Sequence, residues 1–442
     1  MNMILRILTI TLSILFSLQV VSQNPISPAG VYIANPSAHV WNDGKLYIYG
    51  SLDESFNYYC SHRHHVMKTD DMLSWKIYED AFVSKGKGDA VSYNDEVLFA
   101  PDCAYKNGTY YLYYCQPCET TEGVATSSSP TGPFTNGKIL NTGGFNEIDP
   151  SLFIDDDGQA YYIWGQFSLK MAKMKPNMVE LDLKTIKNDV ITEKEHHFHE
   201  GAFLAKRNGI YYLVYADISR AEMPTCIGYA TSKSIFGPYT YRGVIVDNSH
   251  CDPGNWNNHG SIVKFREHWY VFYHRATHNS NIFRKACVEP IYFNPDGTID
   301  EVEMTSQGAG EPLPATKKIE AERACLLFGN VRINSFDEHN EQLDKMGDKD
   351  KVVFKYLDFE EGVKSVTLRI RSNSKGGKIE LFLDKTWHKK IASIDINPAN
   401  ENSRWQTLTF DVKNCTGIHA LWVVASGKNN NLFTIDWLKF NK

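Results

Sequence analysis

Short runs of alternating polar and apolar residues, each about as long as a strand, cover most of this chain. Five of them are rich in aromatic residues and begin at a turn, namely NDGKLYIYGS at 42, KNGTYYLYYC at 106, DDGQAYYIWG at 156, RNGIYYLVYA at 207 and REHWYVFYHR at 266. Four of these turns contain Asp-Gly or Asn-Gly, which favour a tight β-hairpin. Helical periodicity is almost absent, so the pattern predicts an all-β chain.

The aromatic runs recur at intervals of about 50–60 residues, and a second alternating run and a further turn follow each of them. A repeated unit of roughly 50 residues that holds four short strands is typical of a propeller blade. Five such units predict a five-bladed β-propeller over residues 24–305.

The strand before each aromatic run begins in the same way in all five units. A variable residue is followed by Pro or Gly, eight or nine positions before the turn. The first strand of a blade lines the central axis, so we expect the variable residues to meet at one mouth of the channel. They are Asn35, Ala100, Asp149, Glu200 and His259.

This register places Asp149 beside Glu200, with His259 next to Glu200. Paired carboxylates in an aromatic-rich cavity indicate the transfer of a glycosyl group to water. A neighbouring carboxylate raises the pKa of the acid that must stay protonated. Asp-Pro and Glu-Gly are also common turn dipeptides at strand starts, so the hypothesis depends on the agreement of all five units.

The stretches NEIDPSLFIDDDGQAYYIWG, FHEGAFLAKRNGIYYLVYA and NNHGSIVKFREHWYVFYHR resemble glycoside hydrolase family 43. The resemblance covers residues 25 to 305 and implies a five-bladed, inverting enzyme acting on arabinose-, xylose- and galactose-containing plant polysaccharides. It implies that Glu200 is the general acid and that Asp149 tunes its pKa and orients it. His259 matches a histidine that approaches an axial calcium ion, largely through water, or else simply lines the channel. Arg284 matches an arginine near the substrate, with a solvated surface arginine as the alternative.

The first unit departs from that family. The general base there is an Asp in a motif like ADPS, whereas this chain reads ANPS, with Asn35. Inversion requires a carboxylate that takes a proton from water, and an amide lacks that basicity. Three hypotheses follow: Asp53, Glu54 or Asp102 is the base; Asn35 orients water with a proton relay; or the domain binds glycan without hydrolysing it.

Other residues are candidates for the sugar pocket. Trp164 and Phe167 offer aromatic surfaces, and Glu222, in the stretch 217–232, offers a carboxylate for a sugar hydroxyl. A loop carboxylate is more often simply solvated. We also expect Asp53, His259 and Arg284 to contact the substrate.

The N-terminus and the overall composition restrict the cellular setting. Residues 1–22 combine Arg6, a short apolar run and small residues, which predicts a secretory signal peptide, export to the periplasm or exterior, and no stable membrane span. The net charge of −6 gives no reason to expect a nucleic-acid partner. Of the nine Cys, Cys115 and Cys118 form a C-x-x-C within a strand-like run, so we interpret most Cys as core residues.

Beyond residue 305 the pattern changes. Residues 306–318 contain Gly and Pro and predict a linker, and residues 319–442 contain seven alternating runs that predict a β-sandwich. IEAE and TIDWLKF resemble the ends of a family 6 carbohydrate-binding module, a jelly-roll. That resemblance implies a structural calcium held by Glu320, Glu322 and Asp436, with an ordinary edge-strand charge pattern as the alternative.

In such modules an aromatic residue in one loop often contacts the sugar. Lys351 occupies the matching place here, so we expect weak glycan binding through this loop and a packing role for the domain. The sequence as a whole predicts an exported two-domain glycoside hydrolase that releases terminal arabinofuranose or xylose from an oligo- or polysaccharide. The alternatives are a non-hydrolytic glycan-binding protein and a purely structural pair of modules.

Overall fold

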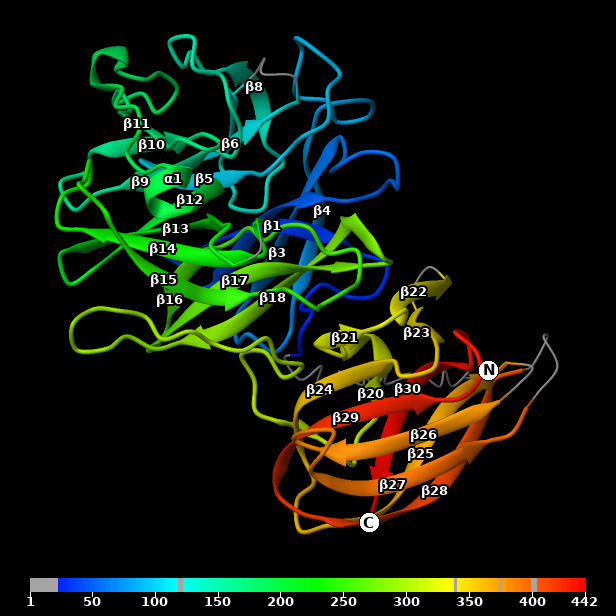
Figure 1. Cartoon of the computed structure of the whole chain (residues 1–442). Coiled ribbons are helices and arrows are strands. Elements are labelled where there is room, and N and C mark those ends of the chain that lie inside the picture. Colours follow the sequence, from blue (N-terminus) through cyan, green and yellow to red (C-terminus); the bar gives the residue numbers. More distant parts are fainter. Residues whose placement is uncertain (1–22, 118–121, 221, 338–339, 374–375, 399–403) are drawn as a thin grey trace, which may run out of the picture.

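A computed structural model describes residues 23–442 except 118–121, 221, 338–339, 374–375 and 399–403. The expected signal peptide lies outside the described residues, so it stays a prediction. Figure 1 shows two β domains that follow one another along the chain. Helical structure in the described residues is confined to α1, Glu193–His196, and two single turns, Leu183–Thr185 and Ala321–Arg323.

The first domain is the predicted five-bladed propeller. Three blades have four antiparallel strands in sequence order, and the third and fifth blades have three. Blade 1 contains β1 Ile33–Val40, β2 Leu46–Leu52, β3 Arg63–Thr69 and β4 Lys76–Val83; blade 2 contains β5 Asp102–Lys106, β6 Thr109–Cys115, β7 Glu122–Ser127 and β8 Thr135–Ile139. Blade 3 contains β9 Ser151–Ile154, β10 Ala160–Trp164 and β11 Lys170–Lys173; blade 4 contains β12 Phe198–Arg207, β13 Ile210–Asp217, β14 Cys226–Ser232 and β15 Thr240–Asp247; blade 5 contains β16 Ser261–Phe265, β17 His268–Thr277 and β18 Ser280–Ile291.

The predicted Asn-Gly turns have the expected geometry. In the hairpins β5–β6 and β12–β13, Asn107 and Gly108, and likewise Asn208 and Gly209, all have positive φ angles between 50° and 86°. Two consecutive left-handed residues are the requirement of a type I′ turn, which matches the twist of the two strands.

The aromatic strands form the cores between neighbouring blades. Successive residues of a strand point to opposite faces, so Ile48 packs toward blade 5 with Phe272, whereas Tyr49 packs toward blade 2 with Leu112. The same alternation recurs around the ring. The aromatic residues therefore serve mainly to fill the space between blades.

The ring closes between blades 1 and 5. The Ser261 hydroxyl donates to the Pro36 carbonyl at 2.8 Å and accepts from the Ala38 amide at 2.9 Å. At the outer side, the Ile26 amide donates to the Ala286 carbonyl of β18 at 2.8 Å. These contacts between distant segments fix the axis on which the candidate site depends.

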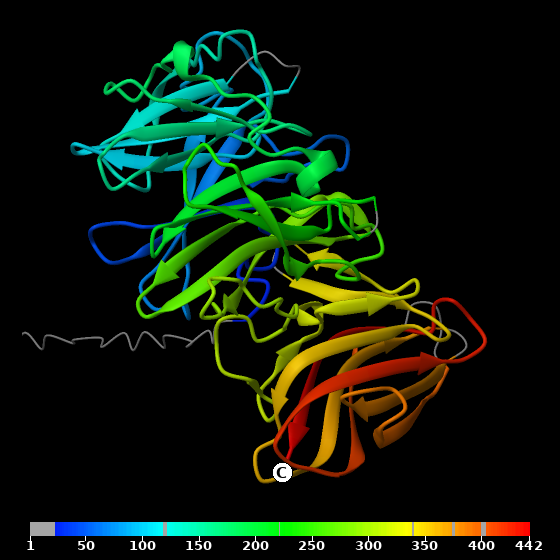
Figure 2. The same ribbon diagram turned by 60° about the vertical axis from the view of Figure 1, so that its left-hand side comes forward.

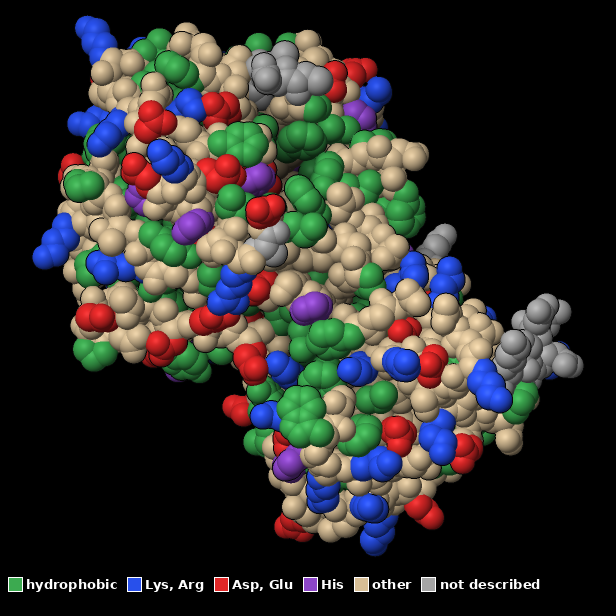
Figure 3. Space-filling model, viewed as in Figure 1, with side chains coloured by type: hydrophobic (Ala, Val, Ile, Leu, Met, Phe, Trp, Pro, Cys, Tyr) green, Lys and Arg blue, Asp and Glu red, His purple; other side chains and the backbone are tan. Residues whose placement is uncertain are grey.

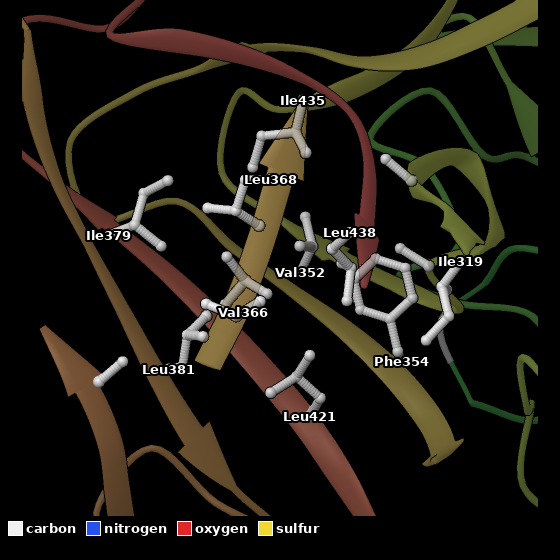
Figure 4. Close-up of a cluster of buried hydrophobic side chains, with 14 of the residues drawn as sticks. Ile319, Val352, Phe354, Val366, Leu368, Ile379, Leu381, Leu421, Ile435 and Leu438 are labelled. Carbon is white, nitrogen blue, oxygen red and sulfur yellow. The ribbon is translucent and has the colours of Figure 1, made fainter. Parts of the chain in front are cut away.

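The C-terminal domain is the predicted β-sandwich. One sheet contains β19 Leu313–Pro314, β24 Lys351–Asp358, β29 Ile418–Ser426, β26 Gly377–Leu383 and β27 Lys389–Ile396, with β21 Leu326–Phe328 on β24. The other contains β22 Arg332–Asp337, β23 Asn340–Met346, β30 Phe433–Asn441, β25 Val363–Ser372 and β28 Gln406–Cys415, with β20 Ile319–Glu320 on β30. Figure 4 shows Val352, Leu368, Leu381, Leu421 and Ile435 meeting in the core between the sheets.

The two domains are in direct contact (Figure 2). Lys285 of β18 forms a buried ion pair with Glu341 of β23, and Tyr32 donates to the same carboxylate at 3.0 Å. The predicted linker is not a free tether, because the Gln307 amide donates to the Lys355 carbonyl of β24 at 2.9 Å. The sandwich also begins earlier than predicted, since β19 starts at Leu313.

The eight cysteines that the structure describes are all buried and none forms a disulfide with another, as expected for core residues. Cys118 of the C-x-x-C lies outside the described residues. Acidic and basic side chains are intermingled on both domains on the face shown in Figure 3. No helix in the described part of the chain has the length and apolar character needed to cross a membrane.

Candidate active site

The strand heads predicted to line the axis have distorted backbones. Asn35 and Asp149 have φ angles of 52° and 61°, and Gly201, which follows Glu200, has 66°. The pairing of β1 with β2 shifts register between Ala34 and Ser37, and that of β12 with β13 shifts on both sides of Glu200. Bulges and left-handed residues redirect side chains out of a regular ladder, so these distortions direct the site residues to the axis.

Asp149, Glu200 and His259 come together, as the repeat register predicted. Asp149 is buried, and its burial, followed by the nearby charge of Glu200, raises its pKa well above the usual range. His259 Nδ1 lies 3.8 Å from Asp149 Oδ2. The closeness of the Asp149 and Glu200 carboxyl groups favours keeping a proton on the pair.

Amide donors hold the Glu200 carboxylate in place. Gln166 Nε2 donates to Oε2 at 2.8 Å, and Asn257 Nδ2 lies 3.5 Å from Oε1. The backbone N–H of Asn35 donates to His274 Nδ1 at 3.3 Å. The ring of His274 therefore carries its hydrogen on Nε2, and Asn257 Oδ1 accepts this hydrogen at 3.1 Å. A continuous network thus connects the backbone of Asn35 to the carboxylate of Glu200.

Gly201 has a steric role beside the acid pair. A Cβ at this position would lie 2.9 Å from three atoms of the His259 ring. The Glu-Gly dipeptide is therefore required for the histidine to pack against the strand that carries Glu200. Burial, and then the charge of Arg284, lower the pKa of His259 to about 3, so its ring is neutral at ordinary pH.

Asn35 is held by one donor and one acceptor. Its Oδ1 accepts from Arg284 Nη1 at 3.1 Å, and its Nδ2 donates to the Ser51 hydroxyl at 2.9 Å. An aspartate could use the same two neighbours, because a hydroxyl can also donate. The surroundings of Asn35 are therefore compatible with the carboxylate that the family resemblance led us to expect.

Arg284 is a buried residue of the site and not a surface arginine. Only 2% of its surface is exposed, and Tyr59 lies under its guanidinium, with 5.1 Å between the guanidinium carbon and the ring centre. Asp53 binds it through two oxygens, at 2.9 Å from Nε and 2.8 Å from Nη2. Arg284 thus bridges Asp53 and Asn35.

Each of the three carboxylates proposed as substitute bases already has a partner in the structure. Asp53 is buried with both oxygens on Arg284, and Glu54 pairs with Arg63 at the surface. Asp102 is buried and accepts hydrogen bonds from its own blade and from the two neighbouring blades. The donors from the neighbouring blades include the Ser37 hydroxyl at 2.5 Å and the Leu152 amide at 2.6 Å. Asp102 therefore joins neighbouring blades at the axis, and a role as the base stays a prediction.

The residues predicted to line the sugar pocket differ in where the structure places them. Trp164 is fully buried between blades 2 and 3, and its indole donates to the Phe145 carbonyl at 2.7 Å. It is a core residue, so its assignment to the sugar pocket is wrong. Phe167 is half exposed next to Gln166, and Glu222 is exposed in the loop after β13; their contact with sugar stays a prediction.

The proposed calcium ligands do not gather in one place. Asp436 pairs with Arg369, and Glu320 pairs with Lys318 at 2.5 Å. The buried Oε2 of Glu322 has no hydrogen-bond partner in the described part of the chain, and burial raises the pKa of Glu322 to about 8. No cluster of three or more His, Cys, Asp or Glu suited to a metal occurs in the described chain, around His259 or elsewhere. The described side chains therefore provide no cluster of three ligands, and calcium binding stays a prediction.

The raised pKa of Asp149 predicts a pH-dependent stability effect. The folded state binds this proton more tightly than the unfolded chain, whose pKa is near 3.8, so stability falls as pH rises above that value. We expect Asp149→Asn to stabilise the protein at pH 7, because the amide does not lose the free energy that the unfolded chain gains by ionising Asp149. Urea unfolding at pH 7 and pH 4 tests this, because the gain should vanish at pH 4; an equal gain at both would contradict it.

A five-bladed propeller with an acidic pair at its axis is the architecture of a glycoside hydrolase. The model of glycosyl hydrolases family 43 matches residues 22–299, more than half of the chain, and the chain belongs to this family. The model of the family 6 carbohydrate-binding module matches residues 331–442. Both resemblances inferred from the sequence are thereby confirmed.

Known relatives match either nearly the whole chain or about three fifths of it. A xylosidase/arabinosidase of Thermoclostridium stercorarium is 29% identical and covers 92% of this chain and 96% of its own length. Xylosidase/arabinosidase 43A of Humicola insolens is 31% identical, over 61% of this chain and 96% of its own. The crystal structure of a family 43 arabinoxylan arabinofuranohydrolase from Bacillus subtilis, in complex with cellotetraose, has a TM-score of 0.56, 26% identity, and covers 96% of this chain and 99% of its own.

Proposed function

We propose that this protein releases terminal arabinofuranose or xylose from plant-type polysaccharides with inversion, using Glu200 as general acid and Asp149 as the residue that tunes it. The observation that carries the proposal is the meeting of two carboxyl groups at the axis, the buried Asp149 of blade 3 and the partly exposed Glu200 of blade 4, because repulsion between their charges favours keeping one proton on the pair. The names of the relatives, xylosidase/arabinosidase and arabinoxylan arabinofuranohydrolase, support these sugars.

In this scheme Glu200 protonates the oxygen of the leaving group, while Gln166 and Asn257 keep its carboxyl oriented. On the opposite face of the sugar, Asn35 accepts a hydrogen bond from water with the remaining lone pair of Oδ1, since its other groups are engaged by Arg284 and Ser51. An amide orients water but does not take its proton, so the proton passes to solvent and turnover is slow.

A second function is favoured by one specific observation. Asn35 stands where the base is expected, and Asp53, Glu54 and Asp102 are all engaged elsewhere. The alternative is therefore a propeller that binds glycan without cleaving it. A protein that neither binds nor cleaves glycan would be a structural pair of modules.

Turnover of aryl α-L-arabinofuranosides and β-xylosides separates these functions. We expect slow hydrolysis by the natural chain, and a further loss of about tenfold in Glu200→Gln, since an aryl leaving group needs only part of the help of a general acid. The outcome that would remove the proposal is a wild-type rate equal to that of Glu200→Gln. Oligosaccharide binding without turnover would then select the second function.

We further infer that residues 1–22 direct export and are removed. The apolar run of the N-terminus supports this inference. N-terminal sequencing of the secreted protein should give a start near residue 23, and an intact Met1 would contradict it.

A further inference from the structure

A cavity of about 760 Å³ lies between the propeller and the sandwich, apart from the acid pair. Its propeller side contains Tyr32, Phe56 and Phe283, and its sandwich side contains Phe336, Gln342 and Asp344. The two sides are joined by the turn after β17, because the His278 amide donates to the Ile333 carbonyl of β22 at 2.9 Å. The volume is in the range that holds a ligand of several rings.

The propeller side presents aromatic rings. Phe56 and Phe283 are stacked, with ring centres 4.0 Å apart and an angle of 19° between the planes. Phe283 is almost fully buried, whereas Phe56 is 62% exposed. A large aromatic side chain left exposed and braced from behind offers a flat face to a ligand.

The sandwich side presents an unsatisfied polar group. Gln342 is 5% exposed, it lines the cavity, and its Oε1 has no hydrogen-bond partner among the residues that the structure describes. A buried carbonyl without a donor is costly, so such a group in a native protein calls for a partner that the protein does not itself supply. The missing partner must be a donor.

The charged residues of the cavity lining indicate what kind of ligand carries this donor. No Lys or Arg lines the cavity among the described residues, so an anionic ligand finds no counter-charge. Both carboxylates of the lining already accept hydrogen bonds: Asp344 accepts from Asn334 at 3.0 Å and from Thr434 at 3.0 Å, and Asp337 accepts from Asn340 at 2.7 and 2.8 Å. Aromatic faces together with an acceptor that lacks a donor fit a neutral polyhydroxylated ring.

The cavity lies near the active site. Tyr59 packs against the cluster of Tyr32, Ile282 and Phe283 and also lies under the Arg284 guanidinium. Burial raises the pKa of Tyr59, Arg284 opposes this, and the charge of Glu200 adds to the rise, which places the acid within electrostatic range. Tyr59 therefore contacts both the aromatic cluster beside the cavity and the arginine of the catalytic centre.

We propose that this interdomain cavity is a distal subsite for the main chain of a neutral polysaccharide, with Phe56 stacking on a pyranose ring and Gln342 accepting from a sugar hydroxyl. The proposal rests on the proposed function for the sugar class. It gives the sandwich a part in substrate binding that does not depend on the loop containing Lys351.

Calorimetric titration with xylohexaose tests the subsite in a Glu200→Gln background, where the loss of the general acid slows consumption of the substrate. We expect Phe56→Ala to raise the Kd by about tenfold, because it removes a stacking face. Tyr292→Ala is the matched control, since Tyr292 is 61% exposed and does not line the cavity, and it should leave the Kd unchanged. The KM for an aryl xyloside should be unchanged by Phe56→Ala, because a short substrate does not reach the cavity.

Gln342→Leu provides a second test, in which stability and affinity for the sugar should not fall together. Replacing an unpaired buried amide by an apolar group of similar size should leave the melting temperature unchanged or higher, while the Kd for xylohexaose rises about fivefold. No binding of xylohexaose, or a Kd unaffected by both substitutions, would overturn the subsite even if aryl glycosides are hydrolysed. Binding that depends on Phe56 without any hydrolysis would retain the subsite and reject the proposed function.

Discussion

The Asn35→Asp variant should hydrolyse aryl arabinofuranosides or xylosides about 10²–10⁴ times faster than the natural chain, the usual contribution of a positioned general base. The reason is chemical: in the natural chain the acid half of an inverting site is present, and the group on the water side is an amide. A carboxylate at this position takes the proton of the attacking water directly.

The surroundings of Asn35 are suited to this substitution. Arg284 already directs Nη1 to Oδ1 at 3.1 Å, and the Ser51 hydroxyl, 2.9 Å from Nδ2, can turn its hydrogen toward a carboxylate oxygen. The left-handed φ of 52° at Asn35 is tolerated by Asp almost as well as by Asn. No repacking is needed, so the substitution tests the chemistry and not the fold.

Two control variants make the Asn35→Asp result interpretable. Asn35→Ala has no carboxylate and should show no gain, and adding Glu200→Gln to Asn35→Asp should abolish most of the gain, because base and acid act in the same step. An Asn35→Asp variant that folds but is no faster than the natural chain would mean that the missing base is not what limits turnover.

The repeat register could be predicted from the sequence because turn chemistry and strand alternation are local. Asn-Gly turns fix where each hairpin reverses, and the residue before Pro or Gly then falls at the same place in every blade. Asp149, Glu200 and His259 could therefore be brought together without knowing any contact between blades. The same register singled out Asn35.

Contacts between blades could not be predicted in this way. Trp164 ends an aromatic strand, and only the packing of blade 3 on blade 2 decides that it is core and not pocket. Asp53 and Arg284 are 231 residues apart in sequence, so their pairing gives no local signal. Asn257 and His274, which help to position Glu200, stood in the motifs, but nothing distinguished them from neighbouring polar residues.

The sandwich shows where strand prediction fails. β22 and β23, Arg332–Asp337 and Asn340–Met346, are rich in polar residues and were not predicted, because one of their faces meets the other domain and the interdomain cavity. The alternating burial of β25 is the opposite case, with one face in the core and one in solvent. Alternation thus predicts strands that face water, and it misses those that face another domain.

Arg284→Met should destabilise the protein by about 3–5 kcal/mol, the usual effect of leaving one partner of a buried ion pair alone. Asp53 and Arg284 have side chains that are 0% and 2% exposed, so water cannot replace the lost guanidinium. Thermal and urea unfolding of the purified chain measure the effect. Arg63→Met is the matched control, because Arg63 pairs with Glu54 and Asp80 at the surface with 38% exposure, and its loss should amount to less than about 1 kcal/mol.

The effect of Arg284→Met should also depend on pH. Burial raises the pKa of Asp53, and Arg284 opposes that rise, so without Arg284 the folded state binds a proton that the unfolded chain releases near pH 3.8. Stability of the variant then falls as pH increases, and its deficit relative to the natural chain should be larger at pH 8 than at pH 5. Adding Asp53→Asn should remove this pH dependence and recover part of the stability, since no charge is then buried alone. A deficit equal at both pH values, unchanged by Asp53→Asn, would show that the two residues act independently and that Arg284 is not the bridge between Asp53 and Asn35.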